Sequence, residues 1–313
     1  MASFKDSFIR RVRTAPGNRS AGDLKNKRDG VLTRLGKNDA CWCGSQKEYR
    51  KCHADFDEKV DHYKRQGHLV PSRQMIKNPL QIAAIRESGK VNAAVLDAVT
   101  EYVKEGVTTE EIDRLIYQKT IELGGYPHNL ATRDFPKVYV CHGIPSPKTV
   151  LCDGDIINVD VSTIYKDYFS DSSRMFCVGN VTKEARRLVR VGQECVILGL
   201  RQVRPWGFLG DLGQVIQEHA VKHGYSVVKK IGGHGIGLRF HEPPWIGYEG
   251  KANTGMLLAP GMIFTIEPII NAGKASIYLA KNGWTYYTED DSLSVQWEVM
   301  VLVTGDGYEV LAY

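Results

Sequence analysis

The sequence predicts an α+β domain over residues 71–313, preceded by a small cysteine-rich module at residues 37–56. Two observations lead to this fold class. From residue 71 onward, pairs of helix-like segments are followed by pairs of strand-like segments, whereas an α/β protein would alternate single strands with single helices. The composition, with 42% apolar and 25% charged residues, is that of an ordinary globular protein.

Capping residues mark the expected helices. Asn78, followed by a proline, starts a helix whose apolar residues keep a period of about 3.6 up to Gly106. Thr108 and Glu111 form a capping box for a second helix, which ends at the two glycines 124 and 125. Further helices are expected at about 183–203 and 211–223, and strands at 156–163, 168–178, 226–231, 262–270 and 292–304.

The first 36 residues form a basic arm that we expect to be disordered, because they are polar and interrupted by glycine and proline. Residues 1–40 contain ten Lys or Arg against four Asp, a net charge of +6, whereas the whole chain carries +5. Such an arm suits a polyanion such as RNA, although a solvated tail without a partner explains the charge equally well. A charged linker follows the cysteine-rich module at residues 57–70.

The number and distribution of the cysteines indicate the cellular compartment of the protein. The seven cysteines, an odd number scattered along the chain, argue against a disulfide framework, so we expect a cytoplasmic protein. No apolar stretch approaches the roughly 18 residues of a membrane span. The first twenty residues lack the apolar segment of a secretory signal, and an organellar transit peptide is the alternative interpretation of this start.

Two aspartates in neighbouring strand segments indicate a metal site. Asp160 lies in the apolar run 155–161 and Asp171 in the segment 168–173. If residues 165 and 166 form the tip of a hairpin, the two aspartates are equally far from it and face each other. Facing carboxylates repel each other unless a cation bridges them or one is protonated. A metal site therefore fits better than surface decoration, which is the alternative for a single aspartate.

Three further residues extend this pattern. Glu267 and Glu298 lie in apolar runs where a solvated face is not expected, and a salt bridge to an arginine is the alternative for each. His234 stands in a glycine-rich segment, 232–237, that is not a dinucleotide loop, because the prolines 243–244 prevent a following helix. Such a set favours a hydrolytic pair of Mn, Fe(II), Co or Zn ions, which activates a water and polarises a carbonyl.

From about residue 71 to residue 313 the chain resembles the type I methionine aminopeptidases, which have the pita-bread (creatinase/aminopeptidase) fold. The matching segments are Val-Cys-His-Gly-Ile-Pro at 140–145, Asp-Gly-Asp-Ile-Ile-Asn-Val-Asp at 153–160, Gly-His-Gly-Ile-Gly at 233–237, Phe-His-Glu-Pro at 240–243 and Gly-Met-Ile-Phe-Thr-Ile-Glu-Pro at 261–268. The resemblance implies a methionyl aminopeptidase, which removes the initiator methionine from nascent proteins when the second residue is small.

The resemblance also implies roles for individual residues. Two divalent metal ions are expected on Asp160, Asp171, His234, Glu267 and Glu298, with Asp171 and Glu298 as the bridging ligands. Glu267 is expected to be the general base toward the attacking water. His142 and His241 are expected to contact the scissile amide, and Phe240 and Trp284 to line the methionine pocket.

The chain departs from the family at the substrate pocket. Between residues 135–137 and Cys141 it is several residues shorter than family members, which removes a pocket cysteine and part of a monovalent-cation site. Thr132 stands where the family has a pocket tyrosine, and Val299 where it has a histidine. All five expected metal ligands are present, so the departures concern substrate binding rather than the metals.

The cysteine-rich module contains Cys41, Cys43, Cys52 and His53, and three thiolates with one imidazole are typical of structural zinc. A segment this small cannot bury enough core to fold alone, so the metal would supply its stability. Three unrelated thiols and a surface histidine are the alternative. The segment resembles the SEC-C motif of the protein-translocation ATPase and of some methionine aminopeptidases, which implies a docking module in which these four residues hold one zinc ion.

We hypothesise that the arm and the module together dock the enzyme on the ribosome, where nascent N-termini emerge. We expect a monomer without membrane attachment. Two other functions remain open. One is a non-catalytic pita-bread protein that binds ribosomes or nascent chains, although such relatives usually lose metal ligands. The other is a proline-directed peptidase of the same fold, which needs a differently built pocket.

Overall fold

The structure, a computed structural model, describes residues 35–131 and 139–313. Its helices are η1 Tyr49–Lys51, α2 Ala54–Arg65, η2 Arg73–Met75, α3 Pro79–Thr100, α4 Thr109–Glu122, α5 Lys183–Leu200 and α6 Leu209–Lys222. Its strands are β1 Tyr126–Ala131, β2 Tyr139–Cys141, β3 Ile156–Tyr165, β4 Tyr168–Cys177, β5 Ser226–Val227, β6 Gly233–Gly235, β7 Glu242–Ile246, β8 Ile263–Ile266, β9 Ile269–Asn271, β10 Ile277–Leu279, β11 Tyr286–Thr288, β12 Ser294–Gln296, β13 Val299–Val303 and β14 Tyr308–Ala312. Apart from residues 35 and 36, the expected basic arm lies outside the described residues.

Helices α3 to α6 begin within two residues of their predicted starts. In α3, Asn78 Oδ1 accepts a hydrogen bond from the Gln81 backbone N–H at 2.9 Å, and Gln81 Oε1 accepts one from the Asn78 N–H at 2.9 Å. The predicted capping box of α4 is also present. α3 ends at Thr100, earlier than predicted, where the threonine hydroxyl donates to the Leu96 carbonyl at 2.9 Å. Among the described helices, none combines the length and apolar character needed to cross a membrane.

The described strands form four sheets. β3 and β4 make a long antiparallel hairpin, which β1 extends to the order β1-β3-β4. The largest sheet has the order β14-β13-β8-β6-β7, and the two others are β12-β9-β5 and β10-β11-β2. Several small, mainly antiparallel sheets combined with separate helix pairs confirm the predicted α+β class.

Two segments predicted as single strands are each broken in two. Residues 262–270 form β8 and β9, which lie in different sheets, and residues 292–304 form β12 and β13, which also lie in different sheets. The first break falls at Glu267, before a proline that cannot donate to a ladder, and the second at Glu298. The prediction of continuous strands was wrong, and the breaks place both glutamates where the chain crosses from one sheet to another. The strand predicted at 226–231 is limited to β5.

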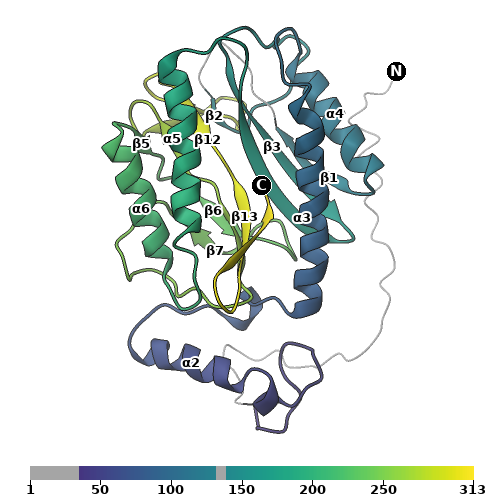
Figure 1. Ribbon diagram of the computed structural model, residues 1–313, viewed down its shortest axis with the longest axis vertical. Helices are drawn as coiled ribbons and strands as arrows, with labels where there is room; N and C mark the ends of the chain where they lie inside the picture. The colour runs from purple at the N-terminus through teal and green to yellow at the C-terminus, as the bar shows by residue number, and fades with distance from the viewer. Residues whose placement is uncertain (1–34, 132–138) are drawn as a thin grey trace. The chain divides into compact units, whose positions relative to one another are not determined.

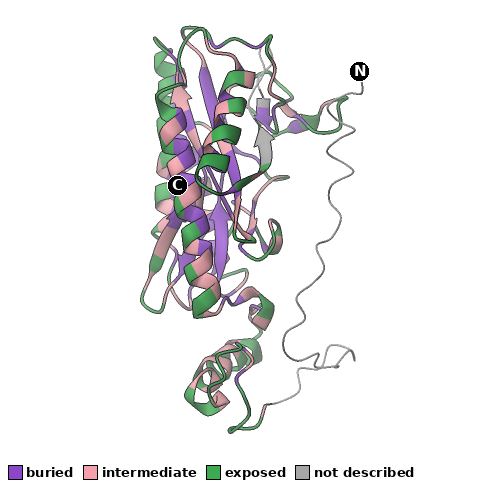
Figure 2. Cartoon of the chain, turned by 90° about the vertical axis from the view of Figure 1, so that its right-hand side faces the viewer, coloured by how far each residue is buried: buried purple, intermediate pink, exposed green. Residues whose placement is uncertain are grey.

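The helices cover the strands from one side, and the side chain of Asp160 lies on the other side. α3 packs on β3 and β4, α4 on β1, and α5 on α6 and β12. Figure 1 shows these helices in front of the strands, and Figure 2 shows buried strands beside helices with exposed outer surfaces. Val159 and Val161 of β3 are buried against Val95 and Leu96 of α3. Since strand side chains alternate, Asp160 points to the opposite face.

Candidate metal centre

The β3–β4 hairpin carries two of the expected metal ligands on one face. Its tip is Lys166-Asp167, and both residues have positive φ, 50° and 67°, as the two-residue turns that fit strand twist require. Asp160 therefore pairs with Ser173, and Asp171 with Ser162. The prediction that the aspartates face each other directly, from a tip at residues 165 and 166, was wrong. They are diagonal neighbours on the same face, still close enough for their carboxylates to interact.

Three more side chains reach this face from other strands. Ser173 and Glu298 form an isolated antiparallel bridge, which brings Glu298 beside the hairpin. His234 lies on β6, and its Nε2 is 4.0 Å from Asp171 Oδ2 and 3.7 Å from Glu267 Oε1. Donor atoms of Asp171, His234 and Glu298 all lie within 4.8 Å of one another. The five residues that the sequence singled out thus converge on one buried place, although their ligand roles stay a prediction.

The carboxylates of this cluster are buried and repel one another. Burial, followed by the charge of Asp160, raises the pKa of Asp171 well above its usual range. Burial and then the charge of Asp171 likewise raise the pKa of Glu298. Burial raises the pKa of Glu267 to about 8. Within the described residues, Glu298 Oε1 is buried without a hydrogen-bond partner. Burying several carboxylates this close together destabilises the fold unless a cation balances their charge. These residues therefore fit divalent metal ions.

Neighbouring side chains fix the orientation of the donor groups. Thr265 Oγ1 donates to Glu267 Oε1 at 2.7 Å, and Gln296 Nε2 donates to Glu267 Oε2 at 3.0 Å. Ser162 Oγ donates to Asp171 Oδ1 at 2.9 Å, which leaves Oδ2 directed at His234. Sequence reasoning missed these supporting residues. Ser162 had a readable signal, because it lies two positions after Asp160 on the same face of β3.

His234 is held as a neutral, oriented imidazole. Its Nδ1 donates to the Gly235 carbonyl at 3.0 Å, so the lone pair of Nε2 is directed toward the carboxylates. Burial lowers the pKa of His234 to about 4, which keeps the imidazole uncharged at neutral pH. Its backbone N–H donates to Thr265 Oγ1 at 3.0 Å, the same hydroxyl that holds Glu267. One threonine therefore positions two of the donor groups.

Aromatic rings lie beside the metal centre. The His234 ring is 5.4 Å from Phe240 and 4.4 Å from His241, measured between centroids. His142 stacks on Trp284 with centroids 4.7 Å apart and an interplanar angle of 22°. Each histidine expected at the scissile amide thus contacts one ring expected in the methionine pocket, His142 with Trp284 and His241 with Phe240, while the roles of these four residues stay predictions.

His128 of β1 is a pocket candidate that the sequence did not reveal. Its ring lies 4.3 Å from Phe240 and 5.4 Å from Phe169 between centroids. Burial, and to a smaller extent the charge of His241, lower its pKa. A lone histidine in a short strand carries no motif, so nothing in the sequence pointed to it. Thr132 and residues 135–137, where the pocket was expected to differ from the family, lie outside the described residues.

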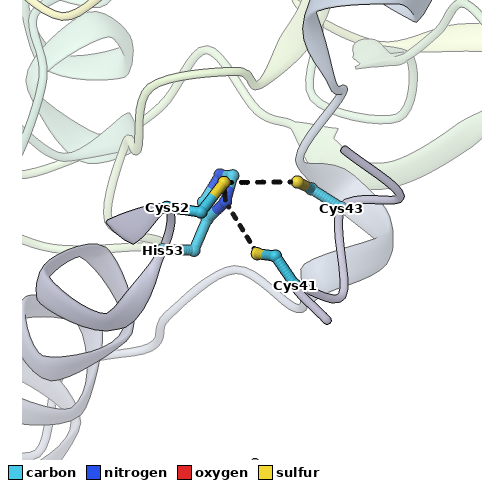
Figure 3. Close-up of side chains that lie close together, drawn as sticks. All are labelled: Cys41, Cys43, Cys52 and His53. Carbon is cyan, nitrogen blue, oxygen red and sulfur yellow. Dashed lines mark hydrogen bonds between the residues drawn. The ribbon is translucent and has the colours of Figure 1, made fainter. Parts of the chain in front are cut away.

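The N-terminal module brings its four predicted zinc ligands together (Figure 3). Cys41 Sγ and Cys52 Sγ each lie 3.2 Å from His53 Nδ1, and Cys43 Sγ lies 3.6 Å from Cys52 Sγ. Tetrahedral zinc with its usual bond lengths places thiolate sulfurs about 3.8 Å apart. The donor set and its spacing therefore fit one structural zinc ion.

Hydrogen bonds and rings link the module to the residues that follow. Asp57 of α2 accepts from Trp42 Nε1 at 3.1 Å, from the Tyr49 hydroxyl at 2.7 Å and from Arg73 at 2.6 Å. Trp42 lies 4.4 Å from the His53 ring between centroids. The predicted boundaries of 37–56 for the module and 57–70 for the linker stay predictions, and α2 runs across the boundary between them.

Two family models match the chain. Residues 83–305 match Metallopeptidase family M24, and residues 38–55 match the SEC-C motif. Methionine aminopeptidase A of Synechocystis sp. is 44% identical over 238 residues, which cover 74% of this chain and 94% of the relative. The methionine aminopeptidase of Chlamydia muridarum is 39% identical over 286 residues, 88% of this chain and 98% of the relative.

A solved structure is similar to the same family of proteins. The crystal structure of the methionine aminopeptidase from Rickettsia prowazekii superposes with a TM-score of 0.73 at 40% sequence identity, covering 76% of this chain and 99% of that chain. The match confirms the pita-bread fold that the sequence predicts. The chain therefore belongs to Metallopeptidase family M24 and, within it, to the methionine aminopeptidases.

Proposed function

We propose that this protein removes the initiator methionine from nascent chains whose second residue is small. The observation that carries the proposal is the convergence of Asp171, His234, Glu267 and Glu298, with Asp160 on the same face, at one buried place. The methionine aminopeptidases that the chain resembles over most of its length support the same function.

The cluster would hold two divalent ions on Asp160, Asp171, His234, Glu267 and Glu298, with Asp171 and Glu298 shared between them. Bound there, the ions supply an activated water and polarise the carbonyl of the scissile bond. Glu267 accepts the proton of the attacking water, for which burial makes its carboxylate a stronger base and Thr265 and Gln296 orient it. His241, beside His234, and His142, on Trp284, orient the substrate amide. Phe240, Trp284 and His128 surround the methionine side chain.

Peptide hydrolysis distinguishes this function from its alternatives. Metal-loaded protein should release methionine from Met-Ala-Ser and leave Met-Lys-Ser and X-Pro peptides intact. Cleavage of the X-Pro peptides would favour a proline-directed peptidase, and no release with Co, Mn, Fe or Zn would favour a non-catalytic binding protein. Asp171→Asn should abolish both turnover and tight metal binding. Retained activity in this variant would contradict a bridging role.

We assign one structural zinc ion to Cys41, Cys43, Cys52 and His53, in addition to the two ions of the metal centre. Metal analysis of the protein purified without added ions should find about one zinc per chain that resists mild chelation, and labile ions beside it. Cys52→Ser should lose the resistant zinc, whereas Cys152→Ser, a change at an exposed free cysteine, should keep it.

The proposed partners are nascent N-termini and, through the basic arm and the module, the ribosome. The net charge of +6 over residues 1–40 supports an RNA surface as the docking site. All seven cysteines are free, which supports a reducing compartment such as the cytoplasm.

A further inference from the structure

A hollow beside the metal centre lies between the zinc module and the M24 domain. It has a volume of about 450 Å³. Its lining includes Trp42 and Cys43 of the module, Gln74 of η2, Asn78 at the cap of α3, and Arg239 and His241 of the loop before β7. We call this hollow the module groove.

The module groove adjoins the metal centre at His241. The imidazole of His241 lines the groove, and its ring centroid is only 4.4 Å from that of His234. A polypeptide whose first amide lies at the metal centre therefore has the groove as an adjoining path for the residues that follow.

The wall formed by the β7 loop is held rigidly. Glu242 Oε1 accepts hydrogen bonds from the backbone N–H groups of Leu238 and Arg239 at 2.7 and 2.8 Å. Glu242 Oε2 accepts from Lys77 Nζ at 2.5 Å, in an ion pair whose side chains are almost fully buried. The loop that carries His241 is thus fixed to the residue that precedes the α3 cap.

The opposite wall is fixed to the zinc module. Asn78 Nδ2 donates to the Cys43 carbonyl at 3.1 Å, so the α3 cap is bonded to one of the proposed zinc ligands. Arg73 lies over the Trp42 ring at 5.4 Å and is neutralised by Asp57 at 2.6 Å. A zinc ion bound by the module would hold Cys43 in position, so metal loading of the module would shape this wall.

We propose that the module groove binds the part of the substrate chain that follows its second residue, so that the zinc module forms part of the substrate-binding surface. This inference rests on the proposed aminopeptidase function. Gln74 is exposed in the groove and offers an amide for the substrate backbone. Arg239 is exposed and makes no ion pair within the described residues, so the groove favours acidic over basic side chains at the third to fifth substrate positions.

Binding of non-hydrolysable peptides tests the proposal without relying on turnover. Three analogues with a reduced first amide bond would be titrated calorimetrically into the metal-loaded full chain: a Met-Ala dipeptide, a Met-Ala hexapeptide with Glu at positions three to five, and its Lys counterpart. The Glu hexapeptide should bind about threefold to tenfold more tightly than the Lys hexapeptide. Arg239→Glu should abolish or reverse this preference, whereas Lys222→Glu, the same charge change on the exposed surface of α6, should keep it.

The contribution of the module is tested with Cys52→Ser, which removes a proposed zinc ligand. The Kd of the Glu hexapeptide should rise about fivefold or more relative to that of the dipeptide. Equal affinities for all three analogues, or an equal loss for dipeptide and hexapeptide in Cys52→Ser, would overturn the proposal. Failure of the aminopeptidase function would appear separately, as absence of methionine release from Met-Ala-Ser.

Discussion

Ser173 and Glu298 join the β3–β4 hairpin to the five-stranded sheet. The Ser173 N–H donates to the Glu298 carbonyl at 3.3 Å, and the Glu298 N–H donates to the Ser173 carbonyl at 3.2 Å. Through this bridge the backbone, rather than any side-chain contact, brings Glu298 beside Asp171. The fold therefore creates the charge cluster even without metal. The cluster must lower the free energy of unfolding of the metal-free protein.

Glu298→Gln should stabilise the metal-free protein and abolish its stabilisation by metal. The buried Glu298 carboxylate is repelled by Asp171 and Glu267, and its raised pKa means that its charged form disfavours the fold at neutral pH. Removing that charge should raise the unfolding free energy by about 1–2 kcal/mol and the Tm by a few degrees. Thermal unfolding in chelator and then with Mn²⁺ measures both effects. Glu289→Gln, at an exposed position, is the control and should behave like the parent protein.

His128→Ala should loosen selection of the first residue. The His128 ring lies 4.3 Å from Phe240, so its removal enlarges the space beside Phe240. We expect KM for Met-Ala-Ser to rise about tenfold with a smaller change in kcat, and the preference for methionine over phenylalanine at the first position to fall. Steady-state kinetics with both peptides measures these changes. His62→Ala, at an exposed site on α2, should leave both values unchanged, and an unaltered preference in His128→Ala would remove His128 from the pocket.

Asp113→Asn should stabilise the protein at pH 8 but not at pH 4. Burial, followed by the charge of Glu110, raises the pKa of Asp113 to about 6, and its buried Oδ1 has no hydrogen-bond partner among the described residues. Because the folded pKa exceeds the unfolded value of about 3.9, the ionised group destabilises the fold above pH 6, and this penalty disappears as the pH falls to 4. The side chain is partly solvated, so we expect a gain of about 1 kcal/mol at pH 8.

Urea unfolding at the two pH values measures this difference, with Asp61→Asn on the exposed face of α2 as the control. An equal gain at pH 4 and pH 8 would show that the effect does not arise from the charge of Asp113.

The helices could be predicted from the sequence because their signals are local. The capping boxes at Asn78 and Thr108 depend on residues only three positions apart. The register of β3 and β4 and the breaks at Glu267 and Glu298 could not be predicted, because they depend on the turn at Lys166-Asp167 and on which sheet each strand joins. For the same reason the sequence revealed the candidate metal ligands as residue types but gave no indication of the module groove, which combines three distant segments.

Deleting residues 1–34 should weaken ribosome binding without affecting peptide hydrolysis. These residues contain nine Lys or Arg and three Asp, so the deletion removes a net charge of +6 while leaving the zinc module and the metal centre intact. Since phosphate contacts release counterions, co-sedimentation of the parent protein with ribosomes should fall steeply between about 50 and 200 mM salt, and the truncated protein should lose most of that dependence. Replacing the nine basic residues with Gln in the full-length chain separates charge from length and should reproduce the deletion. Unchanged co-sedimentation of both variants at low salt, with hydrolysis of Met-Ala-Ser intact, would show that the arm does not dock the enzyme.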